Sequence, residues 1–272
     1  MVATPSKLDS KLLPFDRPDR SLILTGISRS GTSLLCALIN DLPNTVCLNE
    51  VLPTDLDRLP RALARTRRDL LRGRPVANKF DADGSLTTNT LATSVVRDKR
   101  AVNKPLDADL VLGSKRNIPY LLALDRILAL ELPVVVLVRD PVYAIGSWGG
   151  QDALHAQIPG ARIGPENEHP HWAPLHLSRQ DPIERRAEAW QACAERVWTV
   201  HDHVTLLRYE DLCADPERAL DAVARRFGIP LPASLPQRPR PAQNLDDRYP
   251  NLDRVRAAVS ALCPLREALG YA

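Results

Sequence analysis

The stretch Ser21-Leu22-Ile23-Leu24-Thr25-Gly26-Ile27-Ser28-Arg29-Ser30-Gly31-Thr32-Ser33 organises this sequence. Its apolar run from Leu22 to Leu24 is typical of a buried parallel strand. Two glycines, Gly26 and Gly31, enclose a loop of small residues, and a second apolar run over 33–39 predicts a buried helix. A strand, a glycine loop and a helix in this order direct backbone N–H groups and a helix N-terminus toward a phosphate.

The loop differs from the phosphate-binding loop of nucleotide triphosphatases, whose usual pattern is G-x-x-x-x-G-K-S/T. The spacing from Gly26 to Gly31 fits that pattern and Ser33 is in place, but Thr32 stands where the lysine is expected. A cation, Arg29, appears inside the loop instead. Because the missing lysine reaches terminal phosphates, its loss disfavours ATP or GTP hydrolysis and indicates another phosphorylated ligand. The simpler interpretation is a glycine turn that only connects a strand to a helix.

Length and composition indicate a folded protein with a sizeable core. The chain has 272 residues, of which 44% are hydrophobic and 25% are charged. We predict a single domain over residues 1–272, with residues 1–20 as an N-terminal leader. The formal net charge of +3 is too small to predict nucleic-acid binding, but it is compatible with a basic pocket for an anionic ligand.

The cysteines and the N-terminal sequence bear on the cellular compartment. The cysteines are Cys36, Cys47, Cys193, Cys213 and Cys263. They form no C-x-x-C pair, so we interpret them as buried free thiols rather than disulfides or metal ligands. Residues 1–19 lack the apolar core of a signal peptide, and no apolar run is long enough to span a membrane. We therefore predict a cytoplasmic protein.

Apolar runs and helical patterns alternate along the chain, which predicts the α/β class. The predicted strands are 21–26, 45–48, 110–113, 134–138 and 204–207. The predicted helices are 32–41, 54–72, 117–130, 141–148, 182–201, 216–227 and 251–262, with a further helix near 88–97 in an irregular region over 73–107. Strands alternating with helices indicate a three-layer fold, in which helices flank a central parallel sheet, with the nucleotide-binding loop at its edge.

Two segments carry unusual composition. The helix over 54–72 and its end hold many arginines, which we interpret as a solvated basic face; a docking surface for an anionic acceptor is the alternative. The segment 149–181 is rich in glycine, proline and histidine, and a loop of this length predicts a lid over the acceptor site. A metal site built from His169 and His171 is possible there, but no ligand spacing supports it.

Polar residues follow the predicted strands at their carboxyl ends. Ligands of parallel α/β sheets bind beyond these ends. The residues concerned are Arg29, Glu50, Lys115, Arg139 with Ser147, and Tyr209. Together they place three cations, a carboxylate and an aromatic ring on one edge of one sheet, which indicates a site for an anionic ligand.

In these motifs the sequence resembles the sulfotransferases that use 3′-phosphoadenosine 5′-phosphosulfate (PAPS). The segment 26–33 is similar to their 5′-phosphosulfate loop, and Val138-Arg139-Asp140-Pro141 with Ser147 is similar to their 3′-phosphate motif. Supporting similarity comes from Arg208-Tyr209-Glu210-Asp211-Leu212 and from the C-terminal Leu265-Arg266-Glu267-Ala268-Leu269-Gly270-Tyr271. The R-K-G segment of many cytosolic members has no match, and Arg238-Pro239-Arg240-Pro241 in about its place is a different motif.

The resemblance implies a binding set for PAPS as co-substrate, with no metal required. The implied donor-binding residues are Arg29, Ser30, Gly31, Thr32, Ser33, Arg139, Ser147 and Tyr209. Loop amides with the Thr32 and Ser33 hydroxyls would hold the 5′-phosphate. The fork of Arg139, together with Ser147, would hold the 3′-phosphate. A phosphate on the ribose would also explain why the loop has no terminal-phosphate lysine.

The resemblance also implies catalytic roles. Arg29 and Lys115 would stabilise charge on the leaving side, with Arg116 as the alternative to Lys115. Glu50 would accept the proton of the attacking hydroxyl, with His155 in the lid as the alternative base. The implied reaction is sulfuryl transfer to a hydroxyl, less favourably an amine, of a small-molecule or biopolymer acceptor. A nucleotide-dependent kinase and a non-catalytic PAPS-binding homologue are the rival functions.

Overall fold

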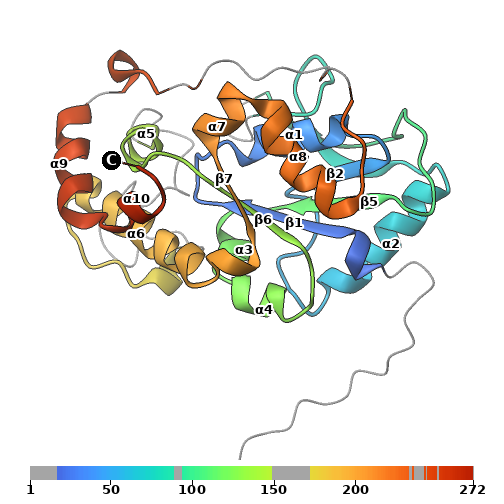
Figure 1. Ribbon diagram of the computed structural model, residues 1–272, viewed down its shortest axis with the longest axis horizontal. Coiled ribbons are helices and arrows are strands. Elements are labelled where there is room, and N and C mark those ends of the chain that lie inside the picture. Colours follow the sequence, from blue (N-terminus) through green and yellow to red (C-terminus); the bar gives the residue numbers. More distant parts are fainter. Residues whose placement is uncertain are drawn as a thin grey trace, which may run out of the picture.

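Strands and helices alternate along the chain and build one parallel sheet with helices on both faces (Figure 1). The computed structural model describes residues 17–88, 94–148, 172–232, 235, 242, 244–249 and 251–271. The strands of the main sheet lie in the order β2-β5-β1-β6-β7, and all neighbours are parallel. Their bounds are β1 Ser21–Gly26, β2 Thr45–Asn49, β5 Val111–Lys115, β6 Val134–Val138 and β7 Thr205–Arg208. The predicted fold class and all five predicted strands are confirmed.

The helices of the described residues agree with most predictions. Their bounds are α1 Thr32–Asp41, α2 Leu59–Leu71, α3 Ile118–Leu121, α4 Leu124–Leu128, α5 Pro141–Gly146, α6 Pro182–Thr199, α7 Tyr209–Ala214, α8 Pro216–Phe227, α9 Leu252–Leu262 and α10 Leu265–Ala268. The helix predicted from residue 54 begins at Leu59, because Pro60 favours a place in the first turn. The helix predicted over 117–130 is two short helices, and α7 and α10 were not predicted.

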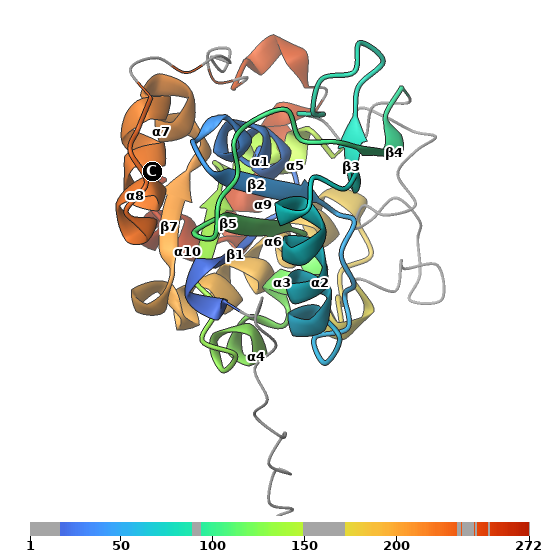
Figure 2. The ribbon, with the colours of Figure 1, turned by 90° about the vertical axis from the view of Figure 1, so that its right-hand side faces the viewer.

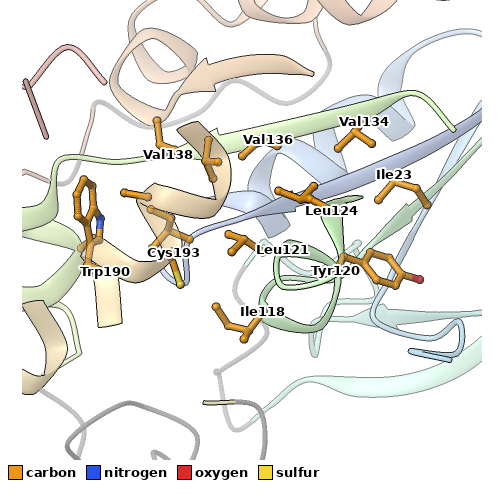
Figure 3. Close-up of a cluster of buried hydrophobic side chains, with 14 of the residues drawn as sticks. Ile23, Ile118, Tyr120, Leu121, Leu124, Val134, Val136, Val138, Trp190 and Cys193 are labelled. Carbon is orange, nitrogen blue, oxygen red and sulfur yellow. The ribbon is translucent and has the colours of Figure 1, made fainter. Parts of the chain in front are cut away.

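The alternation of side chains along the buried strands divides the core between the two faces of the sheet. On one face, Ile23, Val134 and Val136 pack with helices that include α2, α3, α4 and α6 (Figure 3). On the other face, Leu22 and Leu24 pack with α1 and α8. Because helices cover both faces of the sheet, the sequences of these strands are continuous apolar runs. This is why the strands could be predicted from the sequence.

A two-stranded antiparallel hairpin, β3 Val76–Phe80 and β4 Val96–Arg100, extends the fold beside β2 (Figure 2). The buried amide of Asn78 joins it to the sheet edge: its Oδ1 accepts from the Asn49 N–H at 2.8 Å, and its Nδ2 donates to the Cys47 carbonyl at 3.1 Å. The helix predicted near 88–97 is therefore wrong where the structure describes it, because β4 begins at Val96 and pairs with β3. Residues 89–93 lie outside the described residues.

Of the predicted lid over 149–181, the structure describes residues 172–181. Trp148 and Trp172 are both buried and meet edge to face, with ring centroids 5.9 Å apart. Residues 149–171, which include His155, His169 and His171, lie outside the described residues. The contact of the two rings holds Trp172 against Trp148, just after the end of α5.

The five cysteines are free thiols. Four of them are buried, and Cys213 is half-buried. Cys36 on α1 and Cys47 on β2 lie closest together, with Sγ atoms 3.1 Å apart. None of the helices in the described part of the chain is long and apolar enough to cross a membrane.

One arginine of α2 is structural rather than part of a solvated face. Arg67 is buried and donates from Nη2 to the Arg20 carbonyl and to Ser21 Oγ, each at 2.9 Å, and from Nη1 to the Leu110 carbonyl. These acceptors lie where β1 and β5 begin, at the edge of the sheet opposite the phosphate loop. Arg67 therefore fastens α2 to the amino ends of the two central strands.

We expect Arg67→Met to lower the free energy of unfolding by about 3 kcal/mol, because it leaves buried backbone acceptors without a donor. Urea unfolding followed by circular dichroism measures the change. The matched control is Arg65→Met on the same helix, whose side chain is 78% exposed and which should change stability by less than about 0.5 kcal/mol. Equal effects of the two variants would contradict the assignment of Arg67.

Candidate active site

The loop between β1 and α1 is shaped by two glycines that have no room for a side chain. A Cβ on Gly26 would lie 2.2 Å from the Leu137 carbonyl oxygen, and a Cβ on Gly31 would lie 2.6 Å from the ring of Tyr209. Gly31 also has a positive φ of 84° and caps the start of α1. The turn thus carries the chain from the sheet edge directly into a helix whose first N–H groups have no acceptor within the helix.

The hydroxyls around this loop differ in what they bind. Ser30 is buried, and its Oγ has no hydrogen-bond partner among the described residues. Thr32 donates its hydroxyl proton to Asn117 Oδ1 at 2.7 Å, so the residue in the lysine position is held by a neighbouring loop. The backbone carbonyl of Asn117 accepts from Thr25 Oγ1 at 2.8 Å. Asn117 was not singled out from the sequence, because nothing in its local pattern shows that it meets the loop.

Two guanidinium groups meet at the loop. Arg29 has a positive φ of 70°, and its Nε lies 3.4 Å from Ser147 Oγ at the end of α5. Arg139 Nη1 donates to the Arg29 carbonyl oxygen at 3.3 Å. Burial, with the nearby charge of Arg139, lowers the pKa of Arg29. Because the charge of Arg139 disfavours the charged form of Arg29, an anion bound at the loop would relieve this repulsion.

Arg139 is buried and is held from several sides. Its Nε and Nη2 donate to Asn244 Oδ1 at 3.0 and 2.8 Å, and its guanidinium lies 4.6 Å from the ring centroid of Tyr209. The Asn244 amide in turn donates to Glu210 Oε1 at 2.8 Å. Asp140 caps α5 by accepting from the Val142 N–H at 2.8 Å, as its place before Pro141 predicts. Asn244 was missed at the sequence level, because it comes from a distant segment with no local signal. Glu210 lies in the segment quoted beside Tyr209 but was given no role there.

The carboxylate of Glu50 lies between two lysines. Its Oε1 accepts from Lys115 Nζ at 2.6 Å, and its Oε2 accepts from Lys79 Nζ at 2.5 Å. Lys115 is fully buried, and its Nζ also lies 3.2 Å from Ser33 Oγ in the first turn of α1. The structure therefore brings two of the predicted catalytic residues, Glu50 and Lys115, into direct contact beside the phosphate loop.

The backbone at Glu50 is held in an unusual conformation. Its φ is 58°, its N–H donates to the Lys115 carbonyl at 2.9 Å, and its own carbonyl accepts from Arg116 Nη2 at 2.9 Å. Arg116 Nη2 also donates to the Leu52 carbonyl at 2.8 Å. Arg116, the alternative to Lys115, is thus engaged in holding the segment after β2. The position of His155, the alternative base, lies outside the described residues.

The charges around Glu50 decide its ionisation. Burial alone would raise its pKa, but the charges and hydrogen bonds of Lys115 and Lys79 outweigh burial and lower the pKa to about 2. Lys79 was missed at the sequence level, although it is a lone cation in the strand Val76–Phe80. Its role depends on the contact of the hairpin with β2 through the Asn78 side chain, which the sequence pattern did not indicate.

The segment of the chain that holds this site matches a known protein family. The sequence profile of the sulfotransferase family matches residues 21–233, which contain the loop and Glu50, Lys115, Arg139 and Tyr209. The chain belongs to the sulfotransferase family. Members of this family are enzymes that transfer sulfuryl groups, and this sulfotransferase is assigned to them. No curated protein matches the chain.

Several solved structures are similar to this chain, all at low sequence identity. The sulfotransferase domain from the curacin biosynthetic pathway is 15% identical, with a TM-score of 0.45 over 78% of this chain and 75% of that one. Sulfotransferase STF1 from Mycobacterium tuberculosis H37Rv is 18% identical, with a TM-score of 0.43 over 89% and 77% of the two chains. Retinol dehydratase in a complex with retinol and PAP is 14% identical, with a TM-score of 0.33 over 81% and 63%. Because these scores are low, the family assignment rests on the sequence match.

The described part of this sulfotransferase holds no group of three or more His, Cys, Asp or Glu side chains that could bind a metal ion. Cations that contact the loop or Glu50 include Arg29, Lys79, Lys115 and Arg139. Such a gathering of cations is suited to an anionic ligand.

The ion pairs of Glu50 predict a pH-dependent contribution to stability. Its pKa is lowered from 4.5 to about 2, so the contribution is complete above about pH 4.5 and is lost as the pH falls toward 2. We expect Glu50→Gln to be less stable than wild type by about 2 kcal/mol at pH 7, with the difference shrinking below pH ~4.5. Urea unfolding at a series of pH values measures this.

The control for this measurement is Asp57→Asn, since the Asp57 side chain is 86% exposed and its single ion pair, with Arg126, is a surface contact. It should leave the pH profile of unfolding unchanged. A Glu50→Gln protein as stable as wild type at pH 7 would show that the two lysines do not stabilise the carboxylate.

Proposed function

We propose that this sulfotransferase transfers the sulfuryl group of PAPS to a hydroxyl, or less favourably an amine, of an acceptor. The observation that carries the proposal is the convergence of Arg29, Arg139 and Ser147 on the phosphate loop. A nucleotide with phosphates at both the 5′ and the 3′ position needs two cationic positions near one loop. A triphosphate chain needs its cation at position 32, which is a threonine held by Asn117.

The residues present fit such a donor. The first N–H groups of α1 and the buried Ser30 hydroxyl, which has no hydrogen-bond partner in the part of the chain that the structure describes, are donors for a 5′-phosphate. Arg139 presents a buried fork whose two nitrogens now share one acceptor, Asn244 Oδ1, so a phosphate could take the place of that amide. PAPS would supply an activated sulfuryl group at this loop.

The protein's own side chains would then divide the work of transfer. Arg29 and Lys115 would stabilise negative charge on the leaving side, because both are cations that reach the loop. Glu50 would take the proton of the attacking hydroxyl. Its low pKa makes it a weak base while both lysines are bound to it, so this role requires that one of them is released.

The donor is tested by calorimetric titration with 3′-phosphoadenosine 5′-phosphate (PAP) and with Mg²⁺–ATP. We expect PAP to bind and Mg²⁺–ATP to bind far more weakly, because the loop lacks the lysine for terminal phosphates. Binding of Mg²⁺–ATP alone would overturn the proposal in favour of a kinase. Acceptor screening with labelled PAPS completes the test, since PAP binding without transfer to any acceptor would indicate a non-catalytic homologue.

We expect Arg139→Ala to weaken PAP binding by about 10- to 100-fold, because it removes two charge-assisted hydrogen bonds to the 3′-phosphate. The same titration measures the change. Arg225→Ala is the control: this arginine lies on α8 with a side chain that is 76% exposed, and its loss should leave the affinity unchanged. Full affinity in Arg139→Ala would remove Arg139 from the donor site.

A further inference from the structure

Lys115 lies between a carboxylate and the phosphate loop. Its Nζ is 2.6 Å from Glu50 Oε1 and 3.2 Å from Ser33 Oγ, and the residue is 1% exposed. A buried ammonium group needs an anionic partner, because it has no water to solvate its charge. Among the described side chains, Glu50 is the carboxylate that it contacts. An anionic donor bound beside Ser33 would therefore compete with Glu50 for Lys115.

Lys79 approaches the same carboxylate from the other side. It comes from β3, whereas Lys115 comes from the end of β5, and it binds the second oxygen, Oε2. The other cations near Glu50 bind backbone instead: Arg116 donates to the Glu50 carbonyl, and Arg97 of β4 donates to the Val51 carbonyl at 3.3 Å. Lys79 is thus the one ammonium group, among the described residues, that pairs with the carboxylate and does not also reach the loop.

We propose that Glu50 and the donor compete for Lys115. Lys79 is then a positioning residue: it remains paired with Glu50 when Lys115 binds the donor, and in this way it controls the outcome of the competition. The inference rests on the proposed function, because it assumes a nucleotide with a 5′-phosphate at the loop. It assigns to the hairpin β3–β4 a role in the reaction that the loop and the sheet alone do not provide.

The movement of Lys115 from Glu50 to the donor would link donor binding to the basicity of the Glu50 carboxylate. With Lys115 on the donor, Oε1 of Glu50 is open and the carboxylate has lost one of the two charges that suppress its basicity. Lys79 still holds Oε2, so the carboxylate stays in place beside the loop. The proton of the acceptor hydroxyl would then go to Oε1 as the acceptor oxygen forms its bond to sulfur and the bond from sulfur to the donor oxygen breaks.

Because the two interactions of Lys115 are thermodynamically linked, the competition between Glu50 and the donor can be measured in the absence of a sulfuryl acceptor. If donor binding releases Glu50 from Lys115, removing the Glu50 charge must strengthen donor binding. Removing Lys79 must have the opposite effect, because Glu50 then has Lys115 as its single ammonium partner and holds it more firmly. Lys79 acts here through Glu50, so its effect must disappear when Glu50 is neutral.

The experiment is calorimetric titration of the full chain with PAP, using wild type, Glu50→Gln, Lys79→Met and the double variant. We expect Glu50→Gln to bind PAP about fivefold more tightly and Lys79→Met about fivefold more weakly. The double variant should match Glu50→Gln. Lys79→Arg, which keeps the charge, should restore the wild-type affinity, and Lys79→Gln replaces Lys79→Met if the latter does not fold.

The matched control is Arg97→Met. Arg97 pairs with Lys79 across the hairpin and carries the same charge, but it binds the backbone of Val51 rather than Glu50. We expect it to leave PAP affinity unchanged, which would separate a specific contact from the general field of the hairpin. An equal loss in Lys79→Met and Arg97→Met would overturn the inference. So would a loss from Lys79→Met that persists in the Glu50→Gln background.

The results also separate this inference from the function on which it rests. If wild type does not bind PAP, the donor assignment fails and the inference falls with it. If wild type binds PAP but Glu50→Gln gains no affinity, the donor assignment stands and the sharing of Lys115 is wrong.

Discussion

The parallel alignment of the five strands is the constraint on which the site depends. Because every strand runs in the same direction, all five carboxyl ends reach one edge of the sheet. The charged or aromatic residue that follows each end therefore arrives at the same place. These residues are Arg29 after β1, Glu50 after β2, Lys115 at the end of β5, Arg139 after β6 and Tyr209 after β7. Residues spread over 180 positions of the chain thus meet around one loop.

Burying several cations at this edge of the sheet is energetically unfavourable, and hydrogen-bond acceptors of the protein itself offset this effect. Lys115 and Arg139 are both buried, and neither could remain so without a partner. Glu50 supplies the partner of Lys115, and Asn244 supplies that of Arg139. Both acceptors are side-chain atoms rather than backbone of the sheet. Groups of this kind keep the site stable without a ligand and can be displaced by an anion that binds better.

The hairpin β3–β4 serves two purposes at the edge of the sheet. β2 is an edge strand of the main sheet, and the amide of Asn78 satisfies its backbone groups at Asn49 and Cys47. The next residue of the hairpin, Lys79, reaches Glu50. An element that covers an exposed strand edge therefore also completes the charge balance at the carboxylate. This explains how a segment outside the strand–helix alternation comes to lie in the site.

Elements with local signals could be predicted from the amino-acid sequence. Apolar runs located the strands of the sheet, the spacing of Gly26 and Gly31 located the loop, and strand ends located Glu50, Lys115 and Arg139 as neighbours on one edge. Which side chains contact one another at the site depends on how distant segments pack in the folded chain. Lys79, Asn117 and Asn244 have no local signal, because each reaches the site through a pairing between segments far apart in the chain. The ionisation of Glu50 depends on the fold in the same way, since its pKa is lowered to about 2 by two ammonium groups that come from distant parts of the chain.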